Sequence, residues 1–182
     1  PLDFDELKTE SLLAESYQET LFKGFYPAIF DREIDPNIFY ANYLQTYVEK
    51  DVTELLNIRD LMTFRTFLGL CAARAGQLLN ISGLANDCNI SQPTAKAWLS
   101  LLESSYIIFK LHPFHENFNK RLVKSPKLYF NDTGLLCHLL GIRSASEINT
   151  NRLKGNLFEN LILAELQKKN YHQQHDILTF QE

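Results

Sequence analysis

The chain has 182 residues, of which 45% are hydrophobic and 12% aromatic, and its formal net charge is -4. A chain of this length and composition can bury one sizeable core or two small ones, which excludes an intrinsically disordered protein. No run of eighteen apolar residues occurs, and residues 1–6 are acidic rather than basic. The sequence therefore predicts no membrane association and no export signal.

The three cysteines, Cys71, Cys88 and Cys137, stand far apart and never form a CxxC pair. Their spacing is unlike that of a zinc ribbon or a disulfide framework, so we expect them at apolar positions of a protein in the reducing cytoplasm. The chain begins at Pro1 without an initiator methionine and ends at Glu182 within a mixed apolar and polar run. We expect it to be part of a longer polypeptide.

The net charge hides an uneven distribution along the chain. Residues 1–60 carry 5 basic against 13 acidic side chains, whereas residues 77–130 carry 6 basic against 3 acidic ones. A basic segment next to an acidic one is typical of a nucleic-acid-binding face, or of two surfaces that dock on each other or on a partner.

The first portion of the chain, residues 1–76, has helical spacing of apolar residues. The pattern predicts one or two helices over 4–22 that end at Gly24, a loop up to residue 36, and a long amphipathic helix over 37–58. Another helix follows from residue 61 and is expected to end at Gly76. The tyrosines at positions 40, 43 and 47 lie on one face of the long helix and predict either core packing or a subunit interface.

The middle portion, residues 77–130, has shorter elements in an informative order. A brief helix over 81–87 and a tight turn precede Ser91, which is a typical N-cap for a helix over 92–104 with Pro93 in its first turn. Strands are predicted at 106–111 and 127–130, separated by a polar segment. Helix, turn, helix, strand, basic loop and strand is the order of a winged helix-turn-helix with a β-hairpin wing.

The last portion, residues 131–182, returns to helical spacing. Helices are predicted over 133–140, closed by Gly141, and over 155–169, and residues 177–180 could begin a strand. The predicted fold is therefore mainly α, with a helical N-terminal portion, a central winged helix, and a C-terminal helical portion that could begin an α/β unit.

Several blocks of the sequence resemble a known family. In chain order they are GFYP at 24–27, TYVEKDV at 46–52, AARAGQLLN at 72–80, TAKAWL at 94–99, KRLVKSPKLYF at 120–130, DTGL at 132–135 and GNLFEN at 155–160. Together they are similar to the uncharacterised domain that follows the ATPase core in bacterial and archaeal AAA-type predicted ATPases. The resemblance implies an upstream core that binds ATP and magnesium, with residues 1–76 as a remnant of the ATPase lid.

The same resemblance bears on enzymatic activity. This chain has no GxxxxGK[ST] loop, so no residue is assigned to ATP binding. The resemblance also implies a restriction-endonuclease-like region after the winged helix, with Glu159 on its acidic helix and the other metal ligands at or beyond Glu182. A metal-dependent nuclease would then be truncated here, and we expect this chain not to be an enzyme by itself.

The candidate sites for nucleic acid lie on the second helix of the middle portion and on the loop that follows it. Base contacts are predicted for Gln92, Thr94, Lys96 and Ser100, because the first turns of a recognition helix enter the major groove. Phosphate contacts are predicted for the cations Lys120, Arg121, Lys124 and Lys127. The expected partner is double-stranded DNA, because the nearby aromatic residues Tyr106, Phe109 and Tyr129 fit a strand core better than a base-stacking platform.

Other interpretations of these patterns remain open at the level of sequence. The basic loop also fits a solvated hairpin or a surface that docks the acidic N-terminal portion, and the whole chain fits a module that binds its own ATPase domain or forms a homo-oligomer. Two histidine pairs, at 112 and 115 and at 172 and 175, have the spacing of metal ligands. No cysteine or carboxylate completes either pair, so surface histidines and no metal site are expected.

Overall fold

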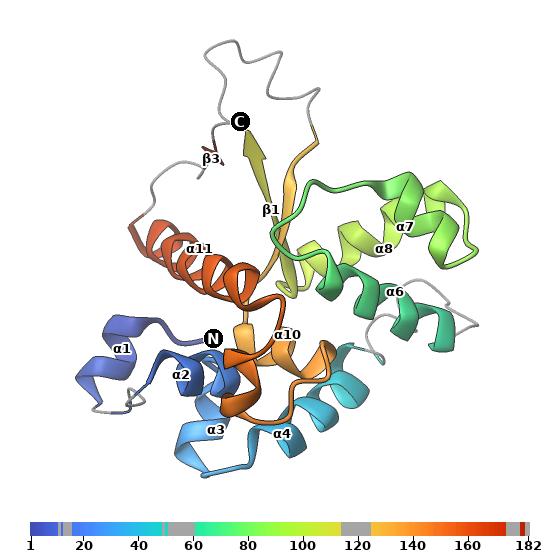
Figure 1. Cartoon of the computed structure of the whole chain (residues 1–182). Coiled ribbons are helices and arrows are strands. Elements are labelled where there is room, and N and C mark those ends of the chain that lie inside the picture. The colour runs from blue at the N-terminus through green and yellow to red at the C-terminus, as the bar shows by residue number, and fades with distance from the viewer. Residues whose placement is uncertain are drawn as a thin grey trace.

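A computed structural model describes residues 1–10, 12, 16–48, 50, 61–113, 125–173 and 179–180. The structure is mainly helical, with a small sheet, as the sequence predicts (Figure 1). Its elements in chain order are α1 (Phe4–Thr9), α2 (Tyr17–Lys23), α3 (Pro27–Asp31), α4 (Pro36–Tyr43), the π-helical η1 (Leu44–Val48), α6 (Leu61–Ala73), α7 (Ile81–Asp87), α8 (Gln92–Ser104), β1 (Ile108–Pro113), β2 (Lys127–Phe130), α10 (Thr133–Leu139), the 3-10 helix η2 (Ala145–Asn149), α11 (Lys154–Gln173) and β3 (Thr179–Phe180).

The first two helices begin and end at residues that are typical helix caps. Asp3 caps α1 by accepting a hydrogen bond from the backbone N–H of Glu6, and Ser16 caps α2 in the same way. α2 ends at Gly24, whose φ of 67° is one that glycine adopts readily, so the predicted end is confirmed. The prediction of a loop after Tyr26 is wrong in part, because Pro27 begins the short helix α3.

The long helix predicted over 37–58 is only partly covered by the described residues. α4 and η1 together run as far as Val48, and residues 51–60 lie outside the described residues. Within that part, Tyr40 is 1% exposed, so this tyrosine packs in the core. The Tyr43 hydroxyl accepts a hydrogen bond from the Tyr26 hydroxyl at 2.8 Å, and the side chain of Tyr47 is outside the described part.

The sheet is built around β1. β2 pairs with it in antiparallel register, with Phe109 opposite Tyr129, and β3 pairs with it in parallel through His112 and Thr179. Phe109 and Tyr129 are buried and stack at 5.5 Å, as strand core residues should. The prediction for Tyr106 is wrong: it has a φ of 55° in the turn before β1 and is 62% exposed.

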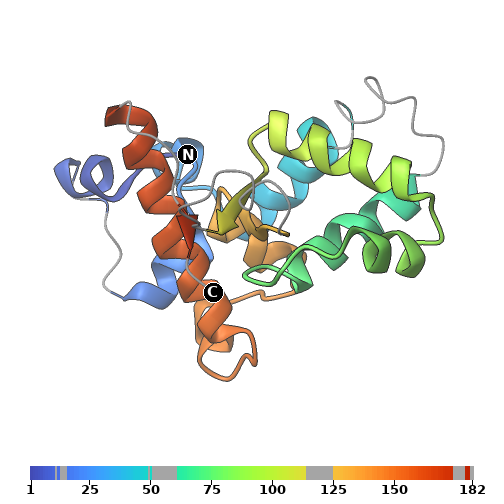
Figure 2. The ribbon, with the colours of Figure 1, turned by 90° about the horizontal axis from the view of Figure 1, so that it is seen from above.

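The main core is continuous through all three portions of the chain. One buried cluster extends from Leu7 in α1 to Leu161 in α11, and α10 packs against α2, α4, α6, α11 and β2. Seen from above, α1 and α11 lie at one side of the molecule and α6, α7 and α8 at the other, with β1 and β2 between them (Figure 2). The domain boundaries after residues 76 and 130 stay predictions. Among the described residues, no helix combines the length and the apolar character needed to cross a bilayer.

Candidate nucleic-acid interface

The start of α8 follows the prediction closely. Ser91 has an extended backbone, and its hydroxyl oxygen accepts a hydrogen bond from the backbone N–H of Thr94 at 3.1 Å. α7 ends just before, and Asn89 turns the chain with a φ of 53°, a conformation that asparagine tolerates. α7 and α8 therefore form a helix-turn-helix whose turn is determined by local side chains.

The inner face of α8 fixes the helix against α6. Its apolar residues Ala95, Trp98, Leu99 and Leu102 are buried, as the sequence stripe predicts. The indole ring of Trp98 meets the rings of Phe64 and Phe67 edge to face, with centroid distances of 5.3 and 5.2 Å. This packing determines which residues of α8 face outward.

The outer face of α8 carries most of the predicted base-contacting residues. Gln92, Lys96 and Ser100 are exposed and follow one another at intervals of four residues, so they form one row along the helix. Thr94 differs from them, because it is half-buried and its hydroxyl lies 2.7 Å from the hydroxyl of Ser91. The structure thus brings three of the four residues together and engages Thr94 in the helix cap.

The segment between α6 and α7 adds an edge to the small sheet. The backbone N–H of Gly76 donates to the carbonyl of Leu128 at 2.8 Å, and that of Leu128 donates to the carbonyl of Gln77 at 3.1 Å. Leu78 forms a β-bridge with Lys127. Strand β2 is therefore held between this segment and β1, directly beside the helix-turn-helix. No sequence pattern predicted this pairing, because a segment that forms a single bridge is too short to show the periodicity of a strand.

The described cations of this region are mostly engaged in ion pairs. Arg74 pairs with Asp87, Lys110 with Glu103 at 2.7 Å, and Lys127 with Glu159 at 3.2 Å. Among the described residues Lys96 has no ion-pair partner, and it is exposed. The predicted phosphate contacts Lys120, Arg121 and Lys124 lie outside the described residues. Any strong attraction for phosphate would therefore depend on the loop between β1 and β2.

Strand β2 is also tied to α11. The side-chain amide of Asn160 is fully buried; its oxygen accepts a hydrogen bond from the N–H of Phe130 and its nitrogen donates to the carbonyl of the same residue, both at 2.8 Å. The Tyr129 hydroxyl donates to Glu159 Oε1 at 2.6 Å. The resemblance places Glu159 on an acidic metal-binding helix. In the structure its carboxylate is hydrogen-bonded to Tyr129 and paired with Lys127.

Side chains that could bind a metal ion do not converge within the described residues. That part of the chain contains no group of three or more His, Cys, Asp and Glu side chains that could hold a metal ion. Of the histidine pairs, His115 and His175 lie outside it. Burial raises the pKa of the Cys71 thiol to about 12, so this thiol stays protonated at neutral pH.

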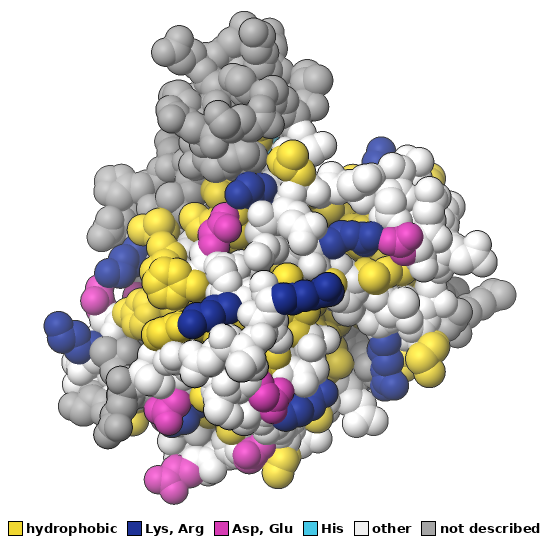
Figure 3. Space-filling view, in the orientation of Figure 1, with side chains coloured by type: hydrophobic (Ala, Val, Ile, Leu, Met, Phe, Trp, Pro, Cys, Tyr) yellow, Lys and Arg dark blue, Asp and Glu magenta, His cyan; other side chains and the backbone are white. Residues whose placement is uncertain are grey.

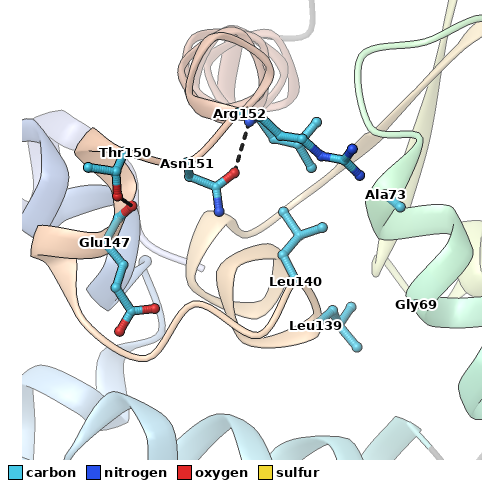
Figure 4. A pocket seen from close by; sticks show the side chains of 9 residues that line it. Gly69, Ala73, Leu139, Leu140, Glu147, Thr150, Asn151 and Arg152 are labelled. Carbon is cyan, nitrogen blue, oxygen red and sulfur yellow. Dashed lines mark hydrogen bonds between the residues drawn. The ribbon is translucent and has the colours of Figure 1, made fainter.

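A groove of about 700 Å³ lies away from the predicted site. It is lined by Gly69, Ala73, Leu139, Leu140, Glu147, Thr150, Asn151, Arg152 and Leu153. The Arg152 side chain extends toward α6, whereas the Glu147 carboxylate points away from it (Figure 4). Of the predicted nucleic-acid contacts that the structure describes, none lines this groove.

Residues 14–146 match a family described as a domain of unknown function, DUF8612. The chain belongs to this family. It is 33% identical over 124 residues to an uncharacterised protein of Mycobacterium bovis and, with the same values, to one of Mycobacterium tuberculosis; each match covers 68% of this chain and 28% of the relative. An uncharacterised protein of Haemophilus influenzae is 24% identical over 185 residues, which cover 94% of this chain and 44% of the relative. No solved structure matches the chain.

The DUF8612 match extends from α2 into η2, so it includes the helix-turn-helix, β1 and β2. α11, with Glu159, lies outside the matched residues. The chain spans less than half the length of these curated relatives.

Proposed function

We propose that this chain is the recognition region of a larger protein and binds double-stranded DNA through α8 and the ribbon formed by β1 and β2. The observation that carries the proposal is the outward row of Gln92, Lys96 and Ser100 on a helix whose opposite face is locked against α6. A rigid helix that presents polar side chains in one row is suited to reading base edges in the major groove.

The order of elements supports a winged-helix assignment. α6, the edge segment at Leu78, α7, α8, β1 and β2 follow one another, and the edge segment pairs with β2. That pairing places the two strands beside the helix-turn-helix, which is where a winged helix has its wing. The segment between the strands contains Lys120, Arg121 and Lys124, which would contact phosphates.

The electrostatics of α8 are compatible with a weak contact that the wing reinforces. No acidic residue lies in the first turn of α8, so the positive end of the helix dipole is not neutralised there. Lys96 adds one positive charge on the outer face. Because a single cation gives little affinity for DNA, most of the phosphate attraction is assigned to the wing.

A fluorescence anisotropy titration with duplex DNA at two or more salt concentrations tests this proposal. We expect micromolar binding that weakens steeply with salt, and we expect Lys120→Ala combined with Arg121→Ala to reduce the slope of log K against log salt by about 1.8. Lys8→Ala with Lys23→Ala, on α1 and α2, removes the same charge elsewhere and should leave the slope unchanged. Absent or salt-insensitive binding would exclude the nucleic-acid role.

The larger protein is proposed to be an AAA-type ATPase. The ordered blocks from GFYP at 24–27 to GNLFEN at 155–160 support this context, and the curated relatives are long enough to hold a further domain. ATP and magnesium would then be bound outside this chain. A Walker-type loop in the coding sequence upstream of Pro1 would support the proposal, and its absence from the whole gene would exclude it.

Self-association through α11 is a second candidate function. This 20-residue helix buries Leu157, Leu161 and Ala164, yet Phe158, Ile162 and Leu166 on its other side are 46%, 42% and 43% exposed. Their spacing of four residues forms one apolar stripe. Hydrophobic side chains gather over and beside α11 on this face of the molecule (Figure 3). An exposed apolar stripe of this kind favours contact with a second copy of the chain.

Size-exclusion chromatography with light scattering tests the second candidate. If α11 forms the contact, the mass should rise from monomer toward dimer with protein concentration, and Ile162→Glu should keep the chain monomeric by placing a charge in the contact. Met62→Glu offers a matched control, because Met62 is 69% exposed on α6, away from the stripe. A monomer at every concentration would exclude self-association, whatever the DNA titration shows.

A further inference from the structure

The carboxylate of Glu159 lies at the base of the proposed wing. Its Oε1 atom accepts a hydrogen bond from the Tyr129 hydroxyl at 2.6 Å and lies 3.2 Å from the Lys127 ammonium. Lys127 is the first residue of β2 and follows the basic segment that ends at Lys124 by three residues. Glu159 of α11 thus forms an ion pair with the cation at the start of β2.

The backbone around this contact is held firmly. Asn160 bonds both backbone groups of Phe130, and Asn156 donates to the carbonyl of Ala75 at 2.9 Å. These hydrogen bonds flank Glu159 on α11, so the helix cannot move away from β2 without breaking them. The side chains of Lys127 and Glu159 are 29% and 42% exposed, so a ligand in solution can reach the ion pair.

Tyr129 is a second partner of the Glu159 carboxylate, besides Lys127. Burial, together with the hydrogen bond to Glu159, raises the pKa of the Tyr129 hydroxyl, which therefore remains a proton donor at neutral pH. The acid has a second donor on the same oxygen atom, and its negative charge would stay near an approaching phosphate.

We propose that Glu159 competes with nucleic-acid phosphate for Lys127, so that the ion pair between α11 and β2 limits the affinity of the wing for DNA. A phosphate must replace the carboxylate as the partner of the lysine, and it must do so next to a remaining negative charge. This inference rests on the proposed DNA binding and assigns Glu159 a positioning role that acts through Lys127.

Glu159→Gln is the direct test, because the amide oxygen can still accept from Tyr129 while the charge is removed. At about 0.1 M salt we expect this variant to bind duplex DNA about three- to tenfold more tightly, with a salt slope steeper by about 0.9. Adding Lys127→Gln to Glu159→Gln should abolish the gain. Glu10→Gln, at an exposed position after α1, makes the same change in net charge and should have little effect.

A second measurement compares Lys127→Gln in two backgrounds. The substitution should lower DNA affinity less in the otherwise unchanged chain, where the carboxylate holds the lysine, than in the Glu159→Gln background, where the lysine can contact phosphate. An equal loss in both backgrounds would overturn the inference. So would a gain in Glu159→Gln that persists without Lys127, or no gain at all while the unchanged chain binds DNA. If no variant binds duplex DNA, the proposed function itself fails.

Discussion

Replacing Asp132 with alanine is expected to lower the free energy of unfolding by about 3 to 5 kcal/mol, the largest effect that we predict for a single residue. Asp132 is 2% exposed, and its carboxylate joins the start of α10 to the N-terminal helices. Oδ1 accepts from the N–H of Leu135 at 2.8 Å and from the Tyr40 hydroxyl at 2.7 Å, while Oδ2 accepts from the N–H of Phe25 at 2.8 Å.

Alanine would leave two backbone donors buried without an acceptor and would remove the N-cap of α10. Each unsatisfied buried donor costs about 1 to 3 kcal/mol, and a lost cap costs about 1 kcal/mol. The Tyr40 hydroxyl would not be left without an acceptor, because the carbonyl of Lys23 also accepts from it at 2.9 Å. Tyr40→Phe should therefore cost only about 1 kcal/mol.

Urea unfolding followed by circular dichroism measures both variants. Asp132→Asn should lower the free energy of unfolding by an intermediate amount. Its side-chain amide has only one oxygen, which can accept from the Tyr40 hydroxyl or from the N–H of Phe25 but not from both. A loss below about 1 kcal/mol for Asp132→Ala would contradict the account, since it would mean that the orphaned donors find water or other partners at little cost.

Gly134→Ala is expected to destabilise the chain by about 2 to 3 kcal/mol, although the same change usually stabilises a helix by about 1 kcal/mol. A Cβ atom on Gly134 would lie 2.3 Å from the Tyr40 hydroxyl oxygen and 2.5 Å from the Cζ atom of the ring. Tyr40 is buried and held by Asp132, so its ring cannot move aside freely. Steric overlap should therefore outweigh the gain in helix propensity.

Gly69→Ala supplies the matched control for this substitution. Gly69 lies within α6, and a Cβ atom there would meet nothing within 4 Å. We expect this variant to stabilise the chain by about 0.5 to 1 kcal/mol. Opposite signs at the two glycines in thermal or urea unfolding are the predicted result. Equal stabilisation at both would show that Tyr40 has room to move.

Local patterns in the sequence predicted the helix-turn-helix well. The start of α8 follows from Ser91 and Pro93, and the end of α10 before Gly141 follows from a glycine that has a φ of 77° in the structure. The buried stripe of α8 follows from helical periodicity alone. These features depend on residues within about two turns of one another, so their chemistry is visible in a short window of sequence.

Contacts between distant residues could not be predicted in the same way. Asp132 and Tyr40 are 92 residues apart, and Lys127 and Glu159 are 32 residues apart; no spacing rule links either pair. Tyr106 was expected in a strand because aromatic residues favour strands, but the turn after α8 requires a positive φ there and leaves its ring exposed. Tertiary packing decided each of these positions.

An isotope-labelled sample titrated with duplex DNA tests the central claim most directly, through the chemical shifts of its backbone amides. If α8 and the wing form the interface, the largest shifts should fall on residues 91–100 and 120–127, and they should shrink as salt is added. Shifts confined to α11, or none at all at millimolar DNA, would contradict the assignment of this region as a DNA-recognition unit.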